Sequence, residues 1–251
     1  MSACFLCRKG AGHKFMIKAV FIDIDNTLLD FDAYVKESLL SGFEKFGLRT
    51  YEDWMYDIFE KVNDGLWLQI EDGSLTFGEL QKIRFNKVFE AIGDIEFDGT
   101  VFEKYFRECL NESAIPVEGA IDMLEYLSGK YILCTASNGP FNQQVHRLEL
   151  AGMLHYFRHN FISEKIGFSK PAREFFDVAL TELNEEQKAR GEAKILPSEI
   201  MIIGDSLTSD MAGGIGSGLK TCWFDREQMG NNKNLAINFV INKLENIKGI
   251  I

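Results

Sequence analysis

Residues 18–30 read KAVFIDIDNTLLD, a short apolar run that stops abruptly at two carboxylates. The run Ala19–Ile22 is rich in β-branched and aromatic residues, and it predicts a strand of a parallel sheet that is buried on both faces. Asp23 and Asp25 then lie at the carboxyl end of this strand, the edge at which open α/β sheets bind ligands. Strand alternation points both side chains to the same side, where two like charges require a cation or a shared proton. An Asx-turn at the strand end explains one acid but not the pair.

Length and composition limit the kinds of protein that this chain can be. Its 251 residues fit one large domain or a core domain with a smaller insert, and an apolar content of 46% is enough for a sizeable core. No apolar run approaches the ~20 residues that span a bilayer, so we expect no membrane role. The net charge of -11 opposes binding to a nucleic acid over a wide surface. A small anionic substrate stays open if a metal or a lysine neutralises it.

The cysteines indicate a reducing environment. There are five of them, an odd number scattered along the chain, which is not typical of a disulfide framework. We therefore expect the protein in the cytoplasm. Cys4 and Cys7, with His13 close behind, could form half a metal site, but no second ligand pair follows at zinc-finger spacing. We interpret residues 1–15 as an N-terminal tail ahead of a natural-looking start at Met16.

Short apolar runs that predict strands alternate with helical patterns along most of the chain. Strands are expected at Ala19 to Ile22, Tyr131 to Thr135, Ile200 to Ile203, Thr221 to Phe224 and Asn238 to Ile241. Helices are expected at Glu118 to Leu127, Phe141 to Leu150 and Pro171 to Leu180, and the charged stretch Asn184 to Lys194 is interpreted as a solvated helix extension or loop. This alternation predicts an α/β fold with a doubly wound parallel sheet.

Residues 31–113 break this alternation. They are rich in Phe, Leu, Glu and Lys at helical spacing without a clear strand, which predicts an all-helical insert. Thr76 and Glu79 have the spacing of a capping box and mark a helix start. The expected organisation is a core domain of residues 16–30 and 114–251 with a helical cap domain of residues 31–113. An insert after the first strand would lie above the carboxyl edge of the sheet, as a candidate lid.

Other predicted strand ends also carry polar residues. Ser137, Asn138 and Gly139 follow the second strand, where Gly139 permits a tight turn into a helix whose first N–H groups could hold an anion. Ordinary turn chemistry explains this tripeptide equally well. Lys170 comes just before Pro171 and a helix start, although a lone lysine at such a place is usually a surface residue.

The last of these strand ends is acidic again. Gly204 and Asp205 follow four apolar residues, and Asp210 comes five residues later. We expect Gly204 to let the backbone approach a ligand closely. Helix capping explains one of the two acids, but it does not explain the repeated placement of acids at the same edge.

Taken in order, the motifs DxDNT, SN, KP and GDxxxxD are far more specific than any one of them. They closely resemble the four motifs of the haloacid dehalogenase (HAD) superfamily, and the resemblance covers essentially the whole chain from Met16 onward. The helical insert between the first two motifs is similar to the cap of subfamily I. GLWLQIEDGSLTFGELQKIRF, ISEKIGFSKP and GDSLTSDMAGGIGSGLKTCWF are most similar to the pyrimidine 5'-nucleotidase branch often called YjjG-like.

The resemblance implies a magnesium-dependent phosphomonoester hydrolase that works through an aspartyl-phosphate. Asp23 would be the nucleophile, and Asp25 would protonate the leaving alkoxide and then activate water. Mg²⁺ would be held by the Asp23 carboxylate, the Asp25 backbone carbonyl and Asp205. Two acids are needed because one attacks in its ionised form while the other supplies a proton. Dehalogenases of the superfamily need neither the second acid nor magnesium, so phosphate-ester chemistry is favoured.

The remaining motif residues would serve the phosphate group. By the same resemblance, Ser137 and the Asn138 amide would hold phosphate oxygens, and Lys170 would neutralise phosphate charge. Asp210 would orient Lys170 or metal-bound water. Phosphoryl transfer depends mostly on such positioning and charge stabilisation.

The expected substrate is a pyrimidine nucleoside 5'-monophosphate. Asn63, Trp67 and Arg84 in the cap are candidates for nucleoside contact, because a base offers a face for stacking and edges for hydrogen bonds, although Trp67 could equally belong to the helix core. The alternatives are a phosphosugar phosphatase or phosphoglucomutase-like enzyme, a 2-haloacid dehalogenase, and a binding protein without activity. The expected partner is a small-molecule phosphomonoester, with no nucleic acid and no membrane, for a monomer or homodimer.

Overall fold

The computed structural model describes residues 16–251, so the predictions about Cys4, Cys7 and His13 lie outside the described residues. The strands are β1 (Ala19–Ile22), β2 (Ile132–Ser137), β3 (His159–Ile162), β4 (Ile200–Gly204), β5 (Lys220–Phe224) and β6 (Phe239–Ile241). They form a six-stranded sheet in the order β3-β2-β1-β4-β5-β6, and every neighbouring pair is parallel. The predicted doubly wound parallel sheet is confirmed.

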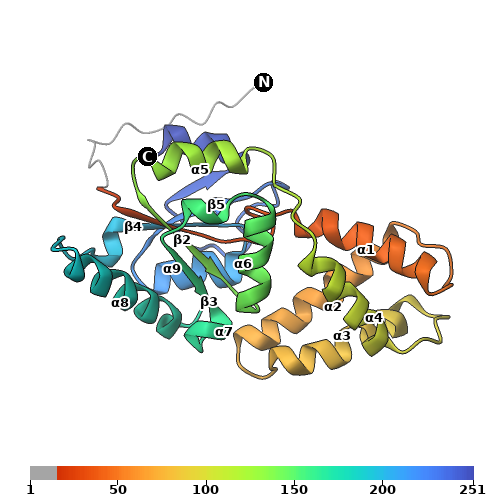
Figure 1. The fold of residues 1–251 in the computed structure, drawn as a ribbon. Coiled ribbons are helices and arrows are strands. Elements are labelled where there is room, and N and C mark those ends of the chain that lie inside the picture. Colours follow the sequence, from red (N-terminus) through yellow and green to blue (C-terminus); the bar gives the residue numbers. More distant parts are fainter. Residues whose placement is uncertain (1–15) are drawn as a thin grey trace.

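Helices cover both faces of the sheet (Figure 1). The core helices and helical turns are α5 (Ala120–Ser128), α6 (Phe141–Leu150), η1 (Leu154–Tyr156), α7 (Ser163–Ile166), α8 (Arg173–Ala189), η2 (Pro197–Glu199), the π-helical turn η3 (Leu207–Met211), α9 (Ala212–Gly216) and η4 (Leu244–Gly249). Val20 and Ile22 of β1 pack in one apolar cluster with α5, while Ala19 and Phe21 pack in another with α8. β1 is therefore buried on both faces, as its uninterrupted apolar run predicts.

The structure differs from the sequence prediction at one strand and one helix. The sequence analysis misses β3, because His159 and Asn160 make the first half of this edge strand polar. Helix α8 begins at Arg173 rather than Pro171 and continues to Ala189, so the first part of the charged stretch is a helix extension.

The insert after β1 is helical, as predicted. Helices α1 (Phe31–Lys45), α2 (Trp54–Glu71), α3 (Phe77–Ile92) and α4 (Gly99–Asn111) lie together beside the core (Figure 1). Their apolar sides share a separate cluster that is rich in phenylalanine, with the rings of Phe85 and Phe102 4.6 Å apart. The capping box of Thr76 and Glu79 is present at the start of α3. The exact division at residues 30/31 and 113/114 stays a prediction.

Two chain segments join the cap to the core, and they contact each other. Leu29, on the way into the cap, pairs with Pro116 on the way out. Arg226, on a core loop, donates to the carboxylates of Asp30 and Asp32 at 2.9 and 3.0 Å. The base of the cap is therefore tied to the core next to the end of β1.

Two further features concern the environment of the chain. None of the helices in residues 16–251 combines the length and the apolar character needed to cross a membrane.

Cys109, Cys134 and Cys222 are free, and burial raises the pKa of the Cys134 and Cys222 thiols to about 12. These two thiols are therefore poor nucleophiles.

Candidate active site

The polar strand ends meet where the strand order of the sheet reverses. β2 and β4 flank β1, and Ile22 at the end of β1 is in register with Thr135 and Ile203. The three strands therefore reach the same edge together. Open α/β sheets bind ligands at such a reversal.

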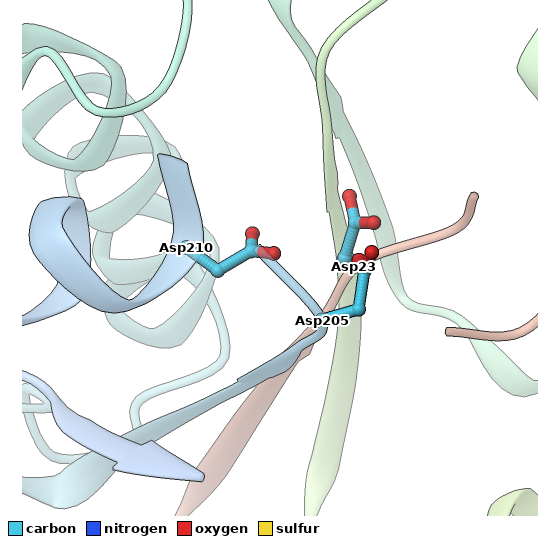
Figure 2. A group of neighbouring side chains, drawn as sticks. All are labelled: Asp23, Asp205 and Asp210. Carbon is cyan, nitrogen blue, oxygen red and sulfur yellow. The ribbon is translucent and has the colours of Figure 1, made fainter. Parts of the chain in front are cut away.

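Three carboxylates converge at this edge. One oxygen each of Asp23, Asp205 and Asp210 lies within 4.8 Å of the others, and Figure 2 shows the three side chains together. Asp210 belongs to the turn η3 and reaches back over Gly204, where an added Cβ would lie 2.2 Å from Asp210 Oδ2. The expectation that Gly204 makes room for a ligand is therefore wrong, because the Asp210 carboxylate fills that space.

Lys170 is the cation of this carboxylate group. It is 1% exposed, and its ammonium donates to Asp23 Oδ1 at 2.7 Å, to Asp210 Oδ1 at 2.6 Å and to the Ala136 carbonyl at 2.5 Å. Asn138 fixes its backbone, donating from Nδ2 to the Lys170 carbonyl at 2.9 Å and accepting from the Lys170 N–H at 2.8 Å. Lys170 is thus no surface residue, and the Asn138 side chain positions it.

Burial dominates the electrostatics of this group. It raises the pKa of Asp23 to about 7, with the charge of Lys170 opposing the rise and that of Asp210 adding to it. It also raises the pKa of Asp205 well above its ordinary value, helped by the charges of Asp23 and Asp210. Burial lowers the pKa of Lys170, but the charges of Asp210 and Asp23 outweigh this effect and raise it. Lys170 therefore stays charged, while Asp23 and Asp205 are harder to ionise than free carboxyl groups.

The carboxylates fit a hard divalent cation. The Lys170 ammonium pairs with two of the three carboxylates, so ionisation of all three leaves uncompensated negative charge, and oxygen ligands suit Mg²⁺ or Ca²⁺. Both oxygens of Asp210 already accept hydrogen bonds, from Lys170 and from a backbone N–H. Asp205 accepts a longer bond of 3.3 Å from Thr27. Asp23 and Asp205 are therefore the better placed ligands, with Asp210 in a supporting position.

Asp25 has separate partners, which the sequence analysis misses. Arg147 donates to Asp25 Oδ1 at 2.6 Å, and Gln144 donates to Oδ2 at 2.7 Å. Arg147 is 1% exposed and also donates to the carbonyl of Ser113, at the foot of the cap, at 3.1 Å. Gln144 and Arg147 are three residues apart on α6 and so share a face. A polar pair on the core-facing side of a helix is the signal that could have indicated them.

The turn after β2 presents a hydroxyl rather than a free helix terminus. Ser137 is buried, and its Oγ accepts from Gln144 Nε2 at 3.1 Å. Gly139 has a φ of +145°, which the turn requires. The N–H of Phe141, at the start of α6, already donates to Glu164 Oε2 at 2.8 Å. The anion site considered at this helix start is therefore partly filled by the protein itself.

A cavity of about 490 Å³ connects the sheet edge with the cap. It is lined by the predicted site residues Asp23, Asp25, Asn63, Trp67, Arg84, Ser137, Asn138, Lys170 and Asp205. In its cap wall, Arg84 is 4% exposed and donates to both carboxylate oxygens of Glu103 at 2.7 and 3.0 Å and to Asn63 at 3.1 Å. The structure thus brings core and cap candidates to one cavity, with Asp210 just behind it.

Several known proteins are similar to this chain over most of its length. The HAD-hydrolase YfnB of Bacillus subtilis (strain 168) is 31% identical over 93% of this chain and 95% of that protein. A crystal structure of YfnB bound to magnesium, described as revealing interdomain movement, superposes with a TM-score of 0.81 over 93% of this chain and 98% of that one.

Two further relatives are pyrimidine 5'-nucleotidases. YjjG of Escherichia coli (strain K12) is 26% identical over 92% of this chain and 96% of that protein. PynA of Streptococcus pneumoniae (strain ATCC BAA-255 / R6) is 31% identical over 86% of each chain. The family model described as haloacid dehalogenase-like hydrolase matches residues 17–218. With its motif residues gathered at one sheet edge, the chain belongs to the haloacid dehalogenase-like hydrolase family.

Proposed function

We propose that this protein is a phosphatase that hydrolyses phosphomonoesters through an aspartyl-phosphate on Asp23. The observation that carries the proposal is the buried ammonium of Lys170, which bridges Asp23 and Asp210 while Asp205 stands alongside with a raised pKa. Within the described residues, Asp23, Asp205 and Asp210 therefore bring more negative charge together than the ammonium of Lys170 balances. A bound cation and an anionic phosphate group together complete the site.

Each half of the reaction uses both motif acids. A carboxylate oxygen of Asp23 attacks phosphorus while the bond between phosphorus and the ester oxygen breaks, and Asp25 gives a proton to the leaving alkoxide. Asp25 then takes a proton from water, whose oxygen attacks phosphorus. Inorganic phosphate leaves and the Asp23 carboxylate is restored. Arg147 and Gln144 keep the Asp25 carboxyl in place through both steps.

The other motif residues hold the phosphate group and its charge. Lys170 would neutralise phosphate oxygens, and Ser137 and Asn138, which line the same cavity, would hold them. Mg²⁺, bound by Asp23, Asp205 and the backbone carbonyl of Asp25, would compensate the negative charge collected there. Phosphate esters are favoured over haloacids as substrates, because a dehalogenase has no use for Asp25 or for the acids of the fourth motif, Asp205 and Asp210.

For the substrate, we infer a pyrimidine nucleoside 5'-monophosphate. Two similar proteins are pyrimidine 5'-nucleotidases, and they cover nearly the whole chain. The cap also offers a surface for a flat ring, since Trp67 and Phe77 line the cavity with ring centroids 5.8 Å apart. The sheet edge is generic for phosphate, so discrimination must come from the cap.

An activity screen tests the reaction and the substrate together. UMP, dUMP and dTMP, their purine counterparts, hexose phosphates and 2-haloacids are each assayed with Mg²⁺ and with excess chelator. We expect the pyrimidine nucleotides to have the highest kcat/KM and the activity to vanish in chelator. Full activity in chelator would reject the metal assignment and reopen the dehalogenase alternative. A tenfold preference for a hexose phosphate, ~1.4 kcal/mol of transition-state discrimination, would favour the phosphosugar alternative.

A tryptophan pair tests whether the cap wall contacts the leaving group. Trp67→Ala should raise KM for UMP several-fold more than KM for a small generic phosphoester. Trp54, on the same helix, is 39% exposed and lies outside the cavity, so Trp54→Ala is the matched control. Equal KM changes for the two substrates in Trp67→Ala would place Trp67 in the cap core instead.

A further inference from the structure

Two arginines of the cap line the cavity, and their contacts differ. The guanidinium of Arg84 donates two hydrogen bonds to Glu103 and one to Asn63. Arg107, on α4, forms no ion pair and no side-chain hydrogen bond within residues 16–251, and its buried Nε has no hydrogen-bond partner there. The guanidinium of Arg107, which lines the cavity, is therefore not held by another side chain of the described residues.

Arg107 lies on the side of the cavity where Asp25 is held. Its carbonyl accepts a hydrogen bond of 3.4 Å from Gln143 of α6, and the next residue, Gln144, donates to Asp25. The proposed reaction has Asp25 protonating the leaving oxygen. The backbone of Arg107 therefore adjoins the part of α6 that holds Asp25, so under the proposed reaction the leaving group would lie on the Arg107 side of the cavity, whereas Lys170 would serve the phosphate group.

The surroundings of Arg107 favour an uncharged flat ring over a second anion. Its guanidinium lies over the Phe77 ring, 6.0 Å from the centroid, and Trp67 packs against Phe77. Asp64 and Glu71, on α2, line the same cavity and would repel an anionic leaving group when ionised. An aromatic wall with hydrogen-bond donors at its edge suits a heterocycle that carries carbonyl oxygens.

We propose that Arg107 is a specificity-determining residue that donates hydrogen bonds to a carbonyl oxygen of a pyrimidine base stacked on the wall of Phe77 and Trp67. This inference rests on the proposed nucleotidase function. The O2 carbonyl is common to uracil, thymine and cytosine, and adenine has no carbonyl oxygen. A site that provides donors for such an oxygen penalises substrates that lack it.

Base-truncated substrates test this role. The kcat/KM values for UMP, AMP and ribose 5-phosphate are measured with the full-length protein and with Arg107→Met. Ribose 5-phosphate keeps the phosphate and the sugar but has no base. We expect Arg107→Met to lower kcat/KM for UMP at least about tenfold, as for the loss of a hydrogen bond to a charged group, and AMP should lose less. The value for ribose 5-phosphate should not change.

Two control variants separate the base contact from charge and folding. Lys104→Met removes a positive charge one turn earlier on α4 from a residue exposed to solvent, and it should leave all three substrates unchanged. Arg107→Lys keeps the charge but loses the planar fork, and it should recover only part of the UMP activity.

The outcomes distinguish this inference from the proposed function. Equal losses for UMP and ribose 5-phosphate in Arg107→Met, or no loss for either, would overturn the role of Arg107 while a wild-type preference for UMP still supports the nucleotidase. A wild-type protein that does not prefer UMP to ribose 5-phosphate would overturn the substrate assignment itself, and the inference with it.

Discussion

The core and the cap each bury a cation, but they balance its charge differently. In the cap, Arg84 faces Glu103 in a one-to-one ion pair, and the third guanidinium nitrogen of Arg84 donates to Asn63. In the core, Lys170 faces two carboxylates directly, and a third lies within 4.8 Å of them. A buried ion pair with equal numbers of positive and negative charges needs no further partner. A buried group with excess negative charge needs a bound cation to compensate it. We therefore expect the chemistry at the core edge and a structural role for Arg84 in the cap.

The largest effect should come from removing the proposed nucleophile. Asp23→Asn should abolish turnover and leave the fold intact, because an amide is too poor a nucleophile to form the covalent intermediate. The measurement is steady-state hydrolysis of UMP together with a circular dichroism spectrum. A folded variant with wild-type turnover would show that Asp23 is not the nucleophile. It would also contradict the assignment of the chemistry to the core edge.

Removing the second motif acid should have a graded effect. Asp25→Asn should lower kcat by roughly 10²-fold to 10⁴-fold, because it removes general acid–base help. The loss should be largest for alkyl phosphates, whose leaving oxygens need a proton most, and smaller for aryl phosphates. Equal losses across a series of leaving groups would contradict the acid role of Asp25.

In the cap, the largest effect should be on stability rather than on turnover. Arg84→Met leaves the carboxylate of Glu103 buried without its partner, which should lower the free energy of unfolding by about 3–5 kcal/mol. The double variant Arg84→Met with Glu103→Gln should regain much of this loss, because it leaves no unpaired charge. Denaturant unfolding of the four proteins of the cycle measures the coupling. A double variant no more stable than Arg84→Met would mean that packing, not charge balance, holds this wall.

The smallest expected effect is a pH dependence of stability that comes from the buried carboxyl of Asp23. Because burial raises the pKa of Asp23 from 3.8 to about 7, the folded protein binds a proton that the unfolded chain has already lost. The stability from this group is present in full below the ordinary pKa and is lost as the pH rises through about 7. Mg²⁺ bound at Asp23 would compete with that proton, so it should raise the melting temperature more at about pH 8 than at about pH 6. A Mg²⁺ shift that is larger at the lower pH would contradict this reasoning.

The sequence predicted the core edge better than the cap wall, for a physical reason. Strand ends of a parallel sheet meet at one edge, so acids after β1 and β4 are near each other in any such fold. The partners of Asp25 did not follow from this rule, since Arg147 is 122 residues away in the chain and approaches from a helix. The pair of Arg84 and Glu103 depends in the same way on how α3 and α4 pack.

Two misses in the fold have local causes. β3 is short, lies at the edge of the sheet and begins with two polar residues, so it lacks the apolar run by which the other strands were found. Gly204 was expected beside a ligand, but it makes room for Asp210, and a side chain that folds back over a glycine leaves no periodic pattern in a sequence.

The central claim is that Asp23 carries a covalent phosphoryl group during turnover, and chemical trapping tests it most directly. The protein is mixed with Mg²⁺ and UMP, quenched rapidly in acid, reduced with borohydride and digested, and its peptides are analysed by mass spectrometry. An acyl phosphate is reduced to an alcohol, so the account predicts that Asp23 becomes homoserine, that this product depends on UMP, and that Asp23→Asn does not form it. A phosphoryl group or a reduction product on any other residue, with Asp23 unchanged, would contradict the account.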